Sequence, residues 1–343
     1  MIERDVPLAP MTTLELGGAA RYFCRADDVE TLRAAIRWAR GRALPVAFLG
    51  GGSNLIVPDE GYEGLVVRLD FRGVEDRDGV RAVMAGEDWS EFVDRCVDDG
   101  LAGVECLAGI PGSVGATPIQ NVGAYGQEVC ETIVKVHALR LSDLDAVELS
   151  PKVCEFAYRD SAFKRRPNEY VVTRVDFALA EGGAPARRYA ELQRATTPDA
   201  TLQEVRDTIV ALRRRKSMVL DDADPNRRSA GSFFTNPLVT ESHAREVAER
   251  AVADGLIADA GAMPSWPAGD GQRKLAAAWL IEGAGYRRGS REGAVGQSSA
   301  HALALVHHGG GTAAELLAYA DAIAAAVETR FRVHLEREPR ILR

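Results

Sequence analysis

The sequence predicts a mixed α+β protein of two or three domains. Its 343 residues exceed what a single hydrophobic core usually holds. Strand and helix patterns alternate through the first third, whereas long helical patterns dominate the last third. The composition, with 46% hydrophobic and 27% charged residues, is that of a globular protein rather than a disordered chain.

The first 70 residues contain the elements of a small α+β unit. Apolar residues at helical spacing predict a helix after residue 28, and Asp27 with Glu30 resembles a capping box at its start. β-branched and aromatic residues predict four strands, at residues 21–26, 44–50, 55–58 and 64–71.

The middle of the chain continues to mix both element types. Strands are predicted at residues 80–87, 132–141 and 170–179, and amphipathic helices at 89–100 and 199–216. An irregular tract at 107–126, punctuated by glycine and proline, separates the first helix from the second strand.

The last part of the chain is rich in helices. A polar, turn-rich segment at 219–231 has the composition of an interdomain link. Helices are predicted at 240–255, 274–285 and 311–331, with a strand at 301–308. In the third helix, spacings of three and four residues predict a core-facing stripe of Leu316, Ala320, Ile323 and Val327.

Charge, cysteine usage and hydropathy exclude several classes of protein. The formal net charge of −8 argues against nucleic acid or anionic membranes as partners. The five cysteines are an odd number without Cys-x-x-Cys spacing, which favours reduced thiols over disulfides or a metal site. The sequence shows no signal peptide and no apolar run of membrane-spanning length, so we expect a cytoplasmic protein.

The stretch LGGGSNLIV, from Leu49 to Val57, is a candidate phosphate-binding turn. Its glycines allow positive φ and close approach of the backbone, and free N–H groups with Ser53 suit phosphate oxygens. No Gly-Lys-Ser/Thr follows and no Gly-x-Gly-x-x-Gly opens a helix, which excludes the Walker loop and the dinucleotide fingerprint. A plain tight turn between two strands is the alternative.

The irregular tract at 107–126 is predicted to be a binding loop, because a linker would be more polar. Its small residues suit packing against a flat ring or a pyrophosphate, and we expect Gln120 and Asn121 to contact polar ring edges. A structural Ω-loop is the alternative.

These two tracts occur in order with the phrases YRDSAFK, AGSFFTNP, KLAAAWLIE and LEREPRI. In this combination the chain resembles the UDP-N-acetylenolpyruvoylglucosamine reductase family, from about Thr12 to Ile341. It resembles the longer subtype, which carries a tyrosine on a substrate loop. The 107–126 tract and the serine phrase are long and specific, whereas the glycine turn alone is a weak signal.

The resemblance implies a flavin fold of the vanillyl-alcohol-oxidase (PCMH) type. FAD-binding subdomains would span residues 1–70 and 71–205, and a C-terminal α+β substrate-binding domain would span 206–331. The strand at 332–343 would join the second subdomain.

The same resemblance implies a reaction. Non-covalent FAD, reduced by NADPH, would deliver hydride to the methylene carbon of UDP-N-acetylglucosamine enolpyruvate. Protonation of the adjacent carbon would give UDP-N-acetylmuramate for peptidoglycan precursor synthesis. The expected protein is a monomer with a small-molecule substrate and no nucleic-acid or membrane partner.

The implied catalytic residues are Arg159, Ser232 and Glu338. Arg159 would bind the substrate carboxylate, Ser232 would be the proton donor, and Glu338 would act as an acid or polarising group near the enolate. The alternatives are an ion pair of Arg159 with Asp160, a capping or core role for Ser232, and Glu336 in place of Glu338. Glu336 is predicted to share a strand face with Glu338.

The implied ligand-binding residues form two sets. The set for FAD comes from both glycine-rich tracts and contains Gly50, Gly51, Gly52, Ser53, Asn54, Leu55, Ile110, Pro111, Gly112, Ser113, Gly115, Ala116, Ile119, Gln120, Asn121, Gly123, Ala124 and Tyr125. The set for substrate contains Tyr125, Tyr189, Arg213, Lys216, Asn236, Lys274 and His301. At least two of the four residues from Arg213 to Lys216 are expected at a solvated helix end, and no metal ligands are expected.

Pro339 departs from the family pattern, in which valine is usual. Because proline has no N–H, we expect it to limit strand pairing beyond Glu338.

The sequence leaves two rival functions open. An FAD-linked oxidase of the same fold often tethers its flavin through histidine, and none of the six histidines lies near residues 50–57. A non-catalytic flavin- or nucleotide-sugar-binding module leaves the Arg, Ser and Glu positions unexplained.

Overall fold

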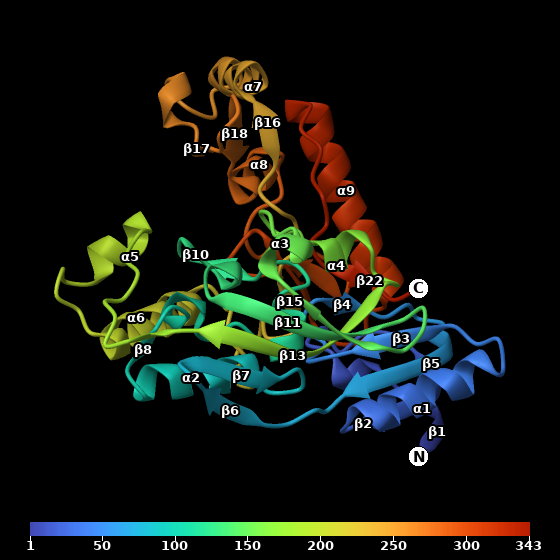
Figure 1. The fold of residues 1–343 in the computed structure, drawn as a ribbon. Helices are drawn as coiled ribbons and strands as arrows, with labels where there is room; N and C mark the ends of the chain where they lie inside the picture. The colour runs from blue at the N-terminus through green and yellow to red at the C-terminus, as the bar shows by residue number, and fades with distance from the viewer.

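The computed structural model describes every residue from Met1 to Arg343 and arranges them in three parts (Figure 1). A mixed sheet comes first, an antiparallel sheet lies beside it, and a helix-rich C-terminal part stands above both in this view. The predicted α+β class is confirmed. None of the helices combines the length and the apolar character needed to cross a bilayer.

The N-terminal sheet has the strand order β1-β2-β5-β3. Strand β5 pairs in parallel with both β2 and β3, and β1 is antiparallel at the edge. Helix α1 covers this sheet with four buried apolar residues at helical spacing. The elements are β1 (Ile2–Pro7), β2 (Ala19–Ala26), α1 (Val29–Arg40), β3 (Val46–Leu49), β4 (Leu55–Ile56) and β5 (Tyr62–Leu69).

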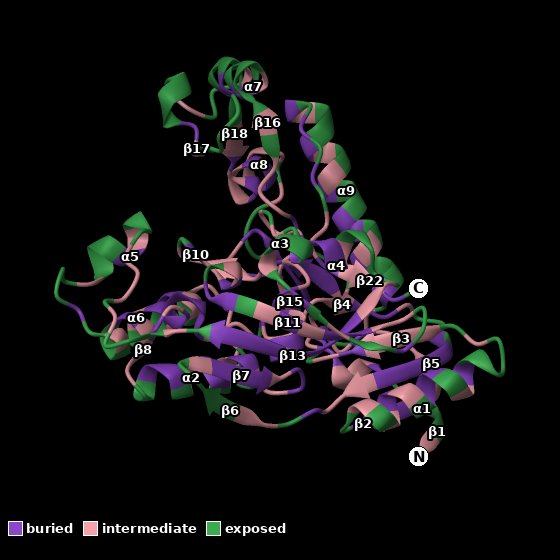
Figure 2. Ribbon diagram, viewed as in Figure 1, coloured by how far each residue is buried: buried purple, intermediate pink, exposed green.

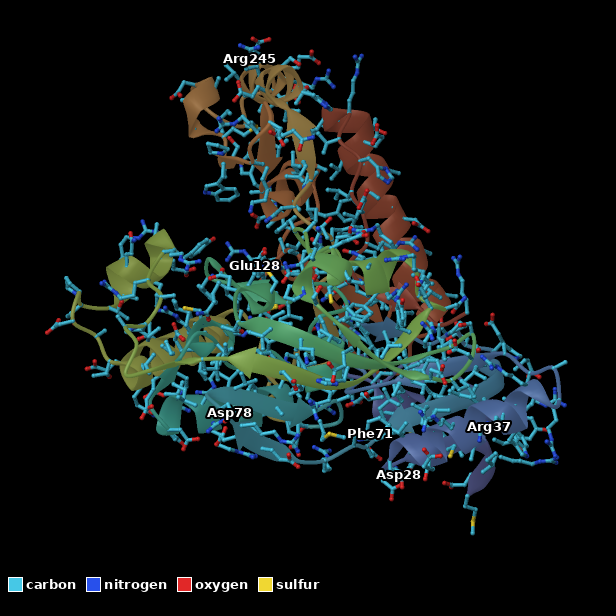
Figure 3. The ribbon with its side chains drawn as sticks, viewed as in Figure 1. Asp28, Arg37, Phe71, Asp78, Glu128 and Arg245 are labelled. Carbon is cyan, nitrogen blue, oxygen red and sulfur yellow. The ribbon has the colours of Figure 1, made fainter.

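Helix α1 is capped one residue later than predicted. Asp28, labelled in Figure 3, accepts a hydrogen bond from the N–H of Thr31 at 2.6 Å. The predicted capping box from Asp27 is therefore wrong, because the position three residues after Asp28 is a threonine rather than Glu30.

The middle sheet is antiparallel, with the order β12-β11-β13-β7-β6. Helices α2 and α6 pack on it through Trp89, Phe92, Val205 and Ile209, and Figure 2 shows β7 and β13 as largely buried. The elements are β6 (Val74–Arg77), β7 (Val80–Met84), α2 (Trp89–Asp98), β8 (Leu101–Ala102), β9 (Gly123–Ala124), β10 (Gln127–Glu128), β11 (Ile133–Arg140), β12 (Ala146–Leu149), α3 (Pro151–Cys154), α4 (Ala162–Arg165), β13 (Tyr170–Ala178), β14 (Ala180–Glu181), α5 (Ala190–Ala195) and α6 (Leu202–Arg215).

The first two sheets share a hydrophobic cluster. Phe71, labelled in Figure 3, is fully buried in it, together with Val67 of β5 and Val171 of β13. The two sheets are therefore packed directly against each other rather than joined only by a linker.

The C-terminal part contains two small antiparallel sheets, with orders β15-β21-β20-β19 and β16-β18-β17. The long helix α9 buries Leu316, Ala320, Ile323 and Val327, as its spacing predicts. The elements are β15 (Ser229–Ser232), β16 (Leu238–Thr240), α7 (Glu241–Ala253), β17 (Ser265–Pro267), β18 (Gln272–Leu275), α8 (Ala277–Gly283), β19 (Arg291–Glu292), β20 (Val295–Gln297), β21 (Ala304–His307), α9 (Ala313–Phe331) and β22 (Arg340–Ile341).

Two predicted domain limits differ from the structure. Residue 205 lies inside α6, and Val205 and Ile209 pack with α2 on the middle sheet, so the whole helix belongs to that part. Strand β22 pairs in parallel with β4 of the N-terminal part, not with the sheet of residues 71–205. The division into three domains stays a prediction.

Pro339 does not end the pairing of the C-terminal strand. The N–H of Glu338 donates to the carbonyl of Phe233 at 2.9 Å, and the N–H of Arg340 donates to the carbonyl of Asn54 at 3.0 Å. The missing N–H of Pro339 falls between these two bonded groups, so no ladder bond is lost. The expectation that Pro339 limits strand pairing beyond Glu338 is wrong, because Arg340 and Ile341 pair with Leu55 and Ile56.

Candidate active site

A cavity of about 650 Å³ is lined by segments from all three parts of the chain. Its walls come from the glycine turn after β3, the 107–126 tract, the region around α4, strand β15 and the C-terminal strand. The volume lies in the range of pockets that enclose cofactors and drug-sized ligands.

The two glycine-rich tracts touch each other at one wall of this cavity. A Cβ atom on Gly51 would lie 2.6 Å from the Cα atom of Gly112, and one on Gly50 would lie 2.4 Å from Oγ of Ser113. The hydroxyl of Ser53 donates to a carbonyl of the second tract at 2.9 Å. The wall is therefore bare backbone, which suits a flat ring system and a pyrophosphate.

All but three of the predicted FAD-binding residues line the cavity; the exceptions are Asn121, Ala124 and Tyr125. Asn121 is fully buried. Its side chain donates to a carboxylate oxygen of Glu128 at 2.8 Å and to the carbonyl of Ala157 at 3.0 Å. The prediction that the Asn121 side chain contacts a ring edge is therefore wrong, because the side chain holds neighbouring loops together.

The three predicted catalytic residues, far apart in sequence, line the same cavity. Nε of Arg159 lies 3.6 Å from Oε1 of Glu338. The alternative ion pair of Arg159 with Asp160 is absent, because Asp160 pairs with Arg165. Arg159 itself adopts a positive φ of 52°, a strained conformation for a residue with a side chain.

Ser232 ends β15, directly after Gly231, whose φ of 73° favours glycine. The Ser232 hydroxyl makes no hydrogen bond within the protein and caps no helix, so the capping alternative is wrong. The next two residues, Phe233 and Phe234, are fully buried in the C-terminal core. They anchor the strand while the serine faces the cavity.

Glu338 and Glu336 have different surroundings. The side chain of Glu338 is only 14% exposed, and its burial raises its pKa above the usual range, although Arg159 and Lys164 act in the opposite direction. Glu336 is exposed and does not line the cavity. Both residues flank Arg337, which forms an antiparallel β-bridge with Phe234, yet only Glu338 lines the cavity.

Two residues of the YRDSAFK phrase were not predicted to take part: Lys164, which lines the cavity, and Tyr158, which contacts Arg159 and Lys274. Nζ of Lys164 donates to the carbonyl of Arg159 at 2.8 Å and so supports its strained backbone. The ring of Tyr158 lies between two cations, with its centroid 4.6 Å from Nζ of Lys274 and 5.3 Å from Cζ of Arg159. The phrase itself was the sequence signal for both residues. Within it, α4 brings Lys164 back to the backbone of Arg159.

Of the predicted substrate-binding residues, only Arg213 lines the cavity. Tyr125, Tyr189 and Lys216 form a separate group, in which the two rings meet edge to face at 5.6 Å. Nζ of Lys216 lies 5.6 Å from the Tyr125 ring centroid and pairs with Glu191 at 2.7 Å. Between Arg213 and Lys216, the two intervening arginines are exposed, as expected for a helix end.

His301, Asn236 and Lys274 complete the substrate set. Burial lowers the pKa of His301 to about 4, with Lys216 acting in the same direction. Nδ1 of His301 accepts the N–H of Leu303 at 3.2 Å, so the neutral ring carries its proton on Nε2. Asn236 and Lys274 instead lie beside Tyr158.

Two family models match this chain. The FAD binding domain matches residues 20–145, and the C-terminal domain of UDP-N-acetylenolpyruvoylglucosamine reductase matches residues 224–342. The UDP-N-acetylenolpyruvoylglucosamine reductase of Thermobifida fusca is 47% identical, over 98% of this chain and 96% of its own length. The chain belongs to the UDP-N-acetylenolpyruvoylglucosamine reductase family.

Two further similarities support the family assignment. The Streptomyces coelicolor reductase is 45% identical over 98% of this chain and 88% of its own. The crystal structure of the Thermus caldophilus reductase superposes with a TM-score of 0.68 at 25% identity, covering 100% of this chain and 99% of the other. The predicted flavin fold is confirmed by these matches.

Family membership decides the activity. The chain is a flavoenzyme oxidoreductase of peptidoglycan precursor synthesis, UDP-N-acetylmuramate dehydrogenase, which uses FAD and NADPH. The oxidase and the non-catalytic binding module, the two rival readings of the sequence, are wrong.

Replacing Gly51 with alanine tests the contact between the two glycine-rich tracts. The added methyl group would meet backbone atoms of Gly112 at 2.6 Å, so the tracts must separate, and we expect FAD affinity to fall by about tenfold or more. Flavin absorbance of the purified protein and FAD titration measure the loss. Gly41→Ala is the control, because a Cβ there meets nothing nearer than 3.5 Å. Full flavin content in Gly51→Ala would contradict the contact's role.

Proposed function

We propose that Ser232, Arg159 and Glu338 carry out the protonation half of the family's reaction, beside an FAD held by the two glycine-rich tracts. The convergence of these three side chains on one cavity with both tracts supports the proposal. FAD, once reduced, supplies the hydride that adds to the methylene carbon of the enolpyruvyl ether.

Arg159 stabilises the charge that hydride addition creates. The electron pair moves to the adjacent carbon and its carboxylate, and a planar guanidinium matches a carboxylate with two parallel N–H donors. The guanidinium is already oriented, because it donates to the carbonyls of Asn121 and Gly123. Lys164 fixes the backbone of the same residue and adds a second positive charge to the site.

Ser232 donates the proton to that carbon. Its hydroxyl is unbonded within the protein and is therefore free to turn toward a substrate in the cavity. A serine hydroxyl is a weak acid, so it transfers a proton only to a strongly basic centre such as a carbanion-like carbon. The resulting alkoxide recovers its proton from water.

Glu338 acts as a neutral carboxylic acid that donates a hydrogen bond to the developing enolate. Its raised pKa favours this form. Because the protonated form is the active one, this contribution is present at low pH and is lost as the pH rises through the pKa of Glu338.

Cations near the cavity bind the diphosphate and carboxylate of the substrate. Burial lowers the pKa of Arg213 to about 10, and its Nε has no hydrogen-bond partner. Burial and the neighbouring Arg159 lower the pKa of Lys274. Such buried cations are stabilised when an anionic ligand pairs with them. Lys216, Tyr189, Asn236 and His301 extend the site toward the rest of the nucleotide sugar.

The enzyme works as a cytoplasmic monomer. All five cysteines are free and four are buried, which suits a reducing compartment. Light scattering should give a mass near 37.0 kDa, and a dimer mass that persists on dilution would contradict the monomer.

Replacing Ser232 with alanine separates the two half-reactions. We expect NADPH to bleach the flavin at an unchanged rate, because no serine proton is needed in that step. Reoxidation by UDP-N-acetylglucosamine enolpyruvate should slow by about 100- to 10,000-fold, the usual loss for a proton donor. Stopped-flow absorbance follows both steps. Reoxidation at the normal rate would show that another group donates the proton.

Exchanging Glu338 and Glu336 separately for glutamine identifies the carboxyl group that matters. Glu338→Gln should slow reoxidation by about 100-fold or more, because an amide is a far weaker acid. Glu336→Gln should leave both half-reactions unchanged, since Glu336 is exposed and outside the cavity. If Glu336→Gln slowed reoxidation and Glu338→Gln did not, Glu336 would be the acid instead.

A further inference from the structure

The two oxygens of the Glu338 carboxyl group have different partners. Oε1 accepts a hydrogen bond from Nε2 of Gln120 at 3.3 Å and faces Nε of Arg159 at 3.6 Å. Oε2 has no hydrogen-bond partner in the protein, on a residue that lines the cavity. Oε1 therefore lies near two donors, whereas Oε2 has no donor within the protein and is left for a ligand.

The Gln120 carboxamide is itself held in one orientation. Its Oε1 accepts a hydrogen bond from Nδ2 of Asn54 at 2.7 Å, which leaves Nε2 to donate to Glu338. The same Asn54 amide lies 3.3 Å from the backbone carbonyl of Glu338. Both polar ends of Gln120 are thus engaged, whereas the sequence predicted that this side chain contacts a ring edge of the cofactor.

We propose that Gln120, held by Asn54, is a positioning residue that makes Oε1 of Glu338 the accepting oxygen and so places its proton on Oε2, toward the cavity. The proposal rests on the acid role proposed above for Glu338. An oxygen that already accepts from an amide and faces a guanidinium is a poor site for a proton, because the added hydrogen would meet two donors. The neutral acid therefore exists mainly as one tautomer.

Asn54 belongs to the glycine turn and Gln120 to the 107–126 tract, the two tracts that form the cofactor wall. The orientation of the acid is thus set by the same backbone contact that shapes this wall. A displacement of either tract would turn the carboxyl group as well as weaken the wall.

The charges around Glu338 give the direction of a pH test. Arg159 and Lys164 face it as cations and favour its ionised form, and Tyr158 is the other titratable group in range. The N–H of Gln120 also stabilises the carboxylate. Removing this donor should therefore raise the pKa of Glu338 and move the alkaline limb of the rate profile to higher pH.

The test measures single-turnover reoxidation by UDP-N-acetylglucosamine enolpyruvate across pH in the FAD-loaded enzyme. Gln120→Leu should keep its flavin content and its rate of reduction by NADPH. Reoxidation should be about 10- to 100-fold slower, because the acid loses its orientation, and its alkaline limb should lie at higher pH. Gln203→Leu, on an exposed position of α6, is the control and should match the parent enzyme.

Gln120→Glu provides a conservative rescue. While the introduced carboxyl group is protonated, it can accept from Asn54 and donate to Glu338 as the amide does. Reoxidation should approach the parent rate at low pH and fall with rising pH, as the introduced carboxyl group ionises beside Glu338. A structural defect would not recover with pH, so this variant tests the proposal even if Gln120→Leu folds poorly.

Double substitution separates this proposal from the proposed acid role. In a Glu338→Gln background, Gln120→Leu should cause no further loss, because the residue it positions is gone. Three results would overturn the positioning role. The rate losses of the two substitutions could be fully additive, the pH profile of Gln120→Leu could be unchanged, or that variant could lose its FAD. An active Glu338→Gln single variant would instead overturn the acid role itself.

Discussion

The site depends on a backbone contact between two glycine-rich tracts that come from different sheets. No side chain fits between Gly51 and Gly112, so the two loops approach as closely as bare peptide allows. This contact brings the end of β3 to the irregular tract that follows α2. Asn54 and Gln120 extend it to Glu338, which lies on the C-terminal strand. One wall of the cavity and the Glu338 carboxyl group are thereby held by the same set of contacts.

The electrostatic character of the site follows from burial of cations with few internal partners. Burial lowers the pKa of both Arg213 and Lys274, and Nε of Arg213 has no hydrogen bond. Uncompensated buried charge destabilises a fold unless a ligand supplies the counter-charge. The one acidic side chain that lines the cavity, Glu338, has its pKa raised rather than lowered. The cavity thus keeps its positive charge available for an anionic substrate.

Local patterns in the sequence predicted much of this fold. The stripe on α9 and the main strands follow from apolar spacing and β-branched content, which depend only on neighbouring residues. The glycine phrases and YRDSAFK carried the family resemblance, and through it Arg159, Ser232 and Glu338. These three residues line one cavity, yet no periodicity in the sequence implies their proximity.

Features that depend on distant pairing escaped prediction. The partner of the C-terminal strand was placed in the wrong sheet, because nothing in LEREPRI indicates which edge accepts it. The Asn121 side chain was expected to contact the cofactor, but it donates hydrogen bonds to Glu128 and Ala157. These partners are close to Asn121 only in the folded loop. The boundary at residue 205 cuts α6 (Leu202–Arg215), although apolar spacing had already predicted a single helix over 199–216.

The C-terminal strand has a consequence for how the enzyme becomes active. Asn54 and Glu338, which it brings together, are 284 residues apart, so closing this contact requires nearly all the intervening chain to be in place. Contacts of such long range form late, after local elements and their sheets. During synthesis the N-terminal part emerges first, with the edge of β4 still open. The contact between Asn54 and Glu338 should therefore be among the last to form, and a partly folded chain lacks the complete cavity.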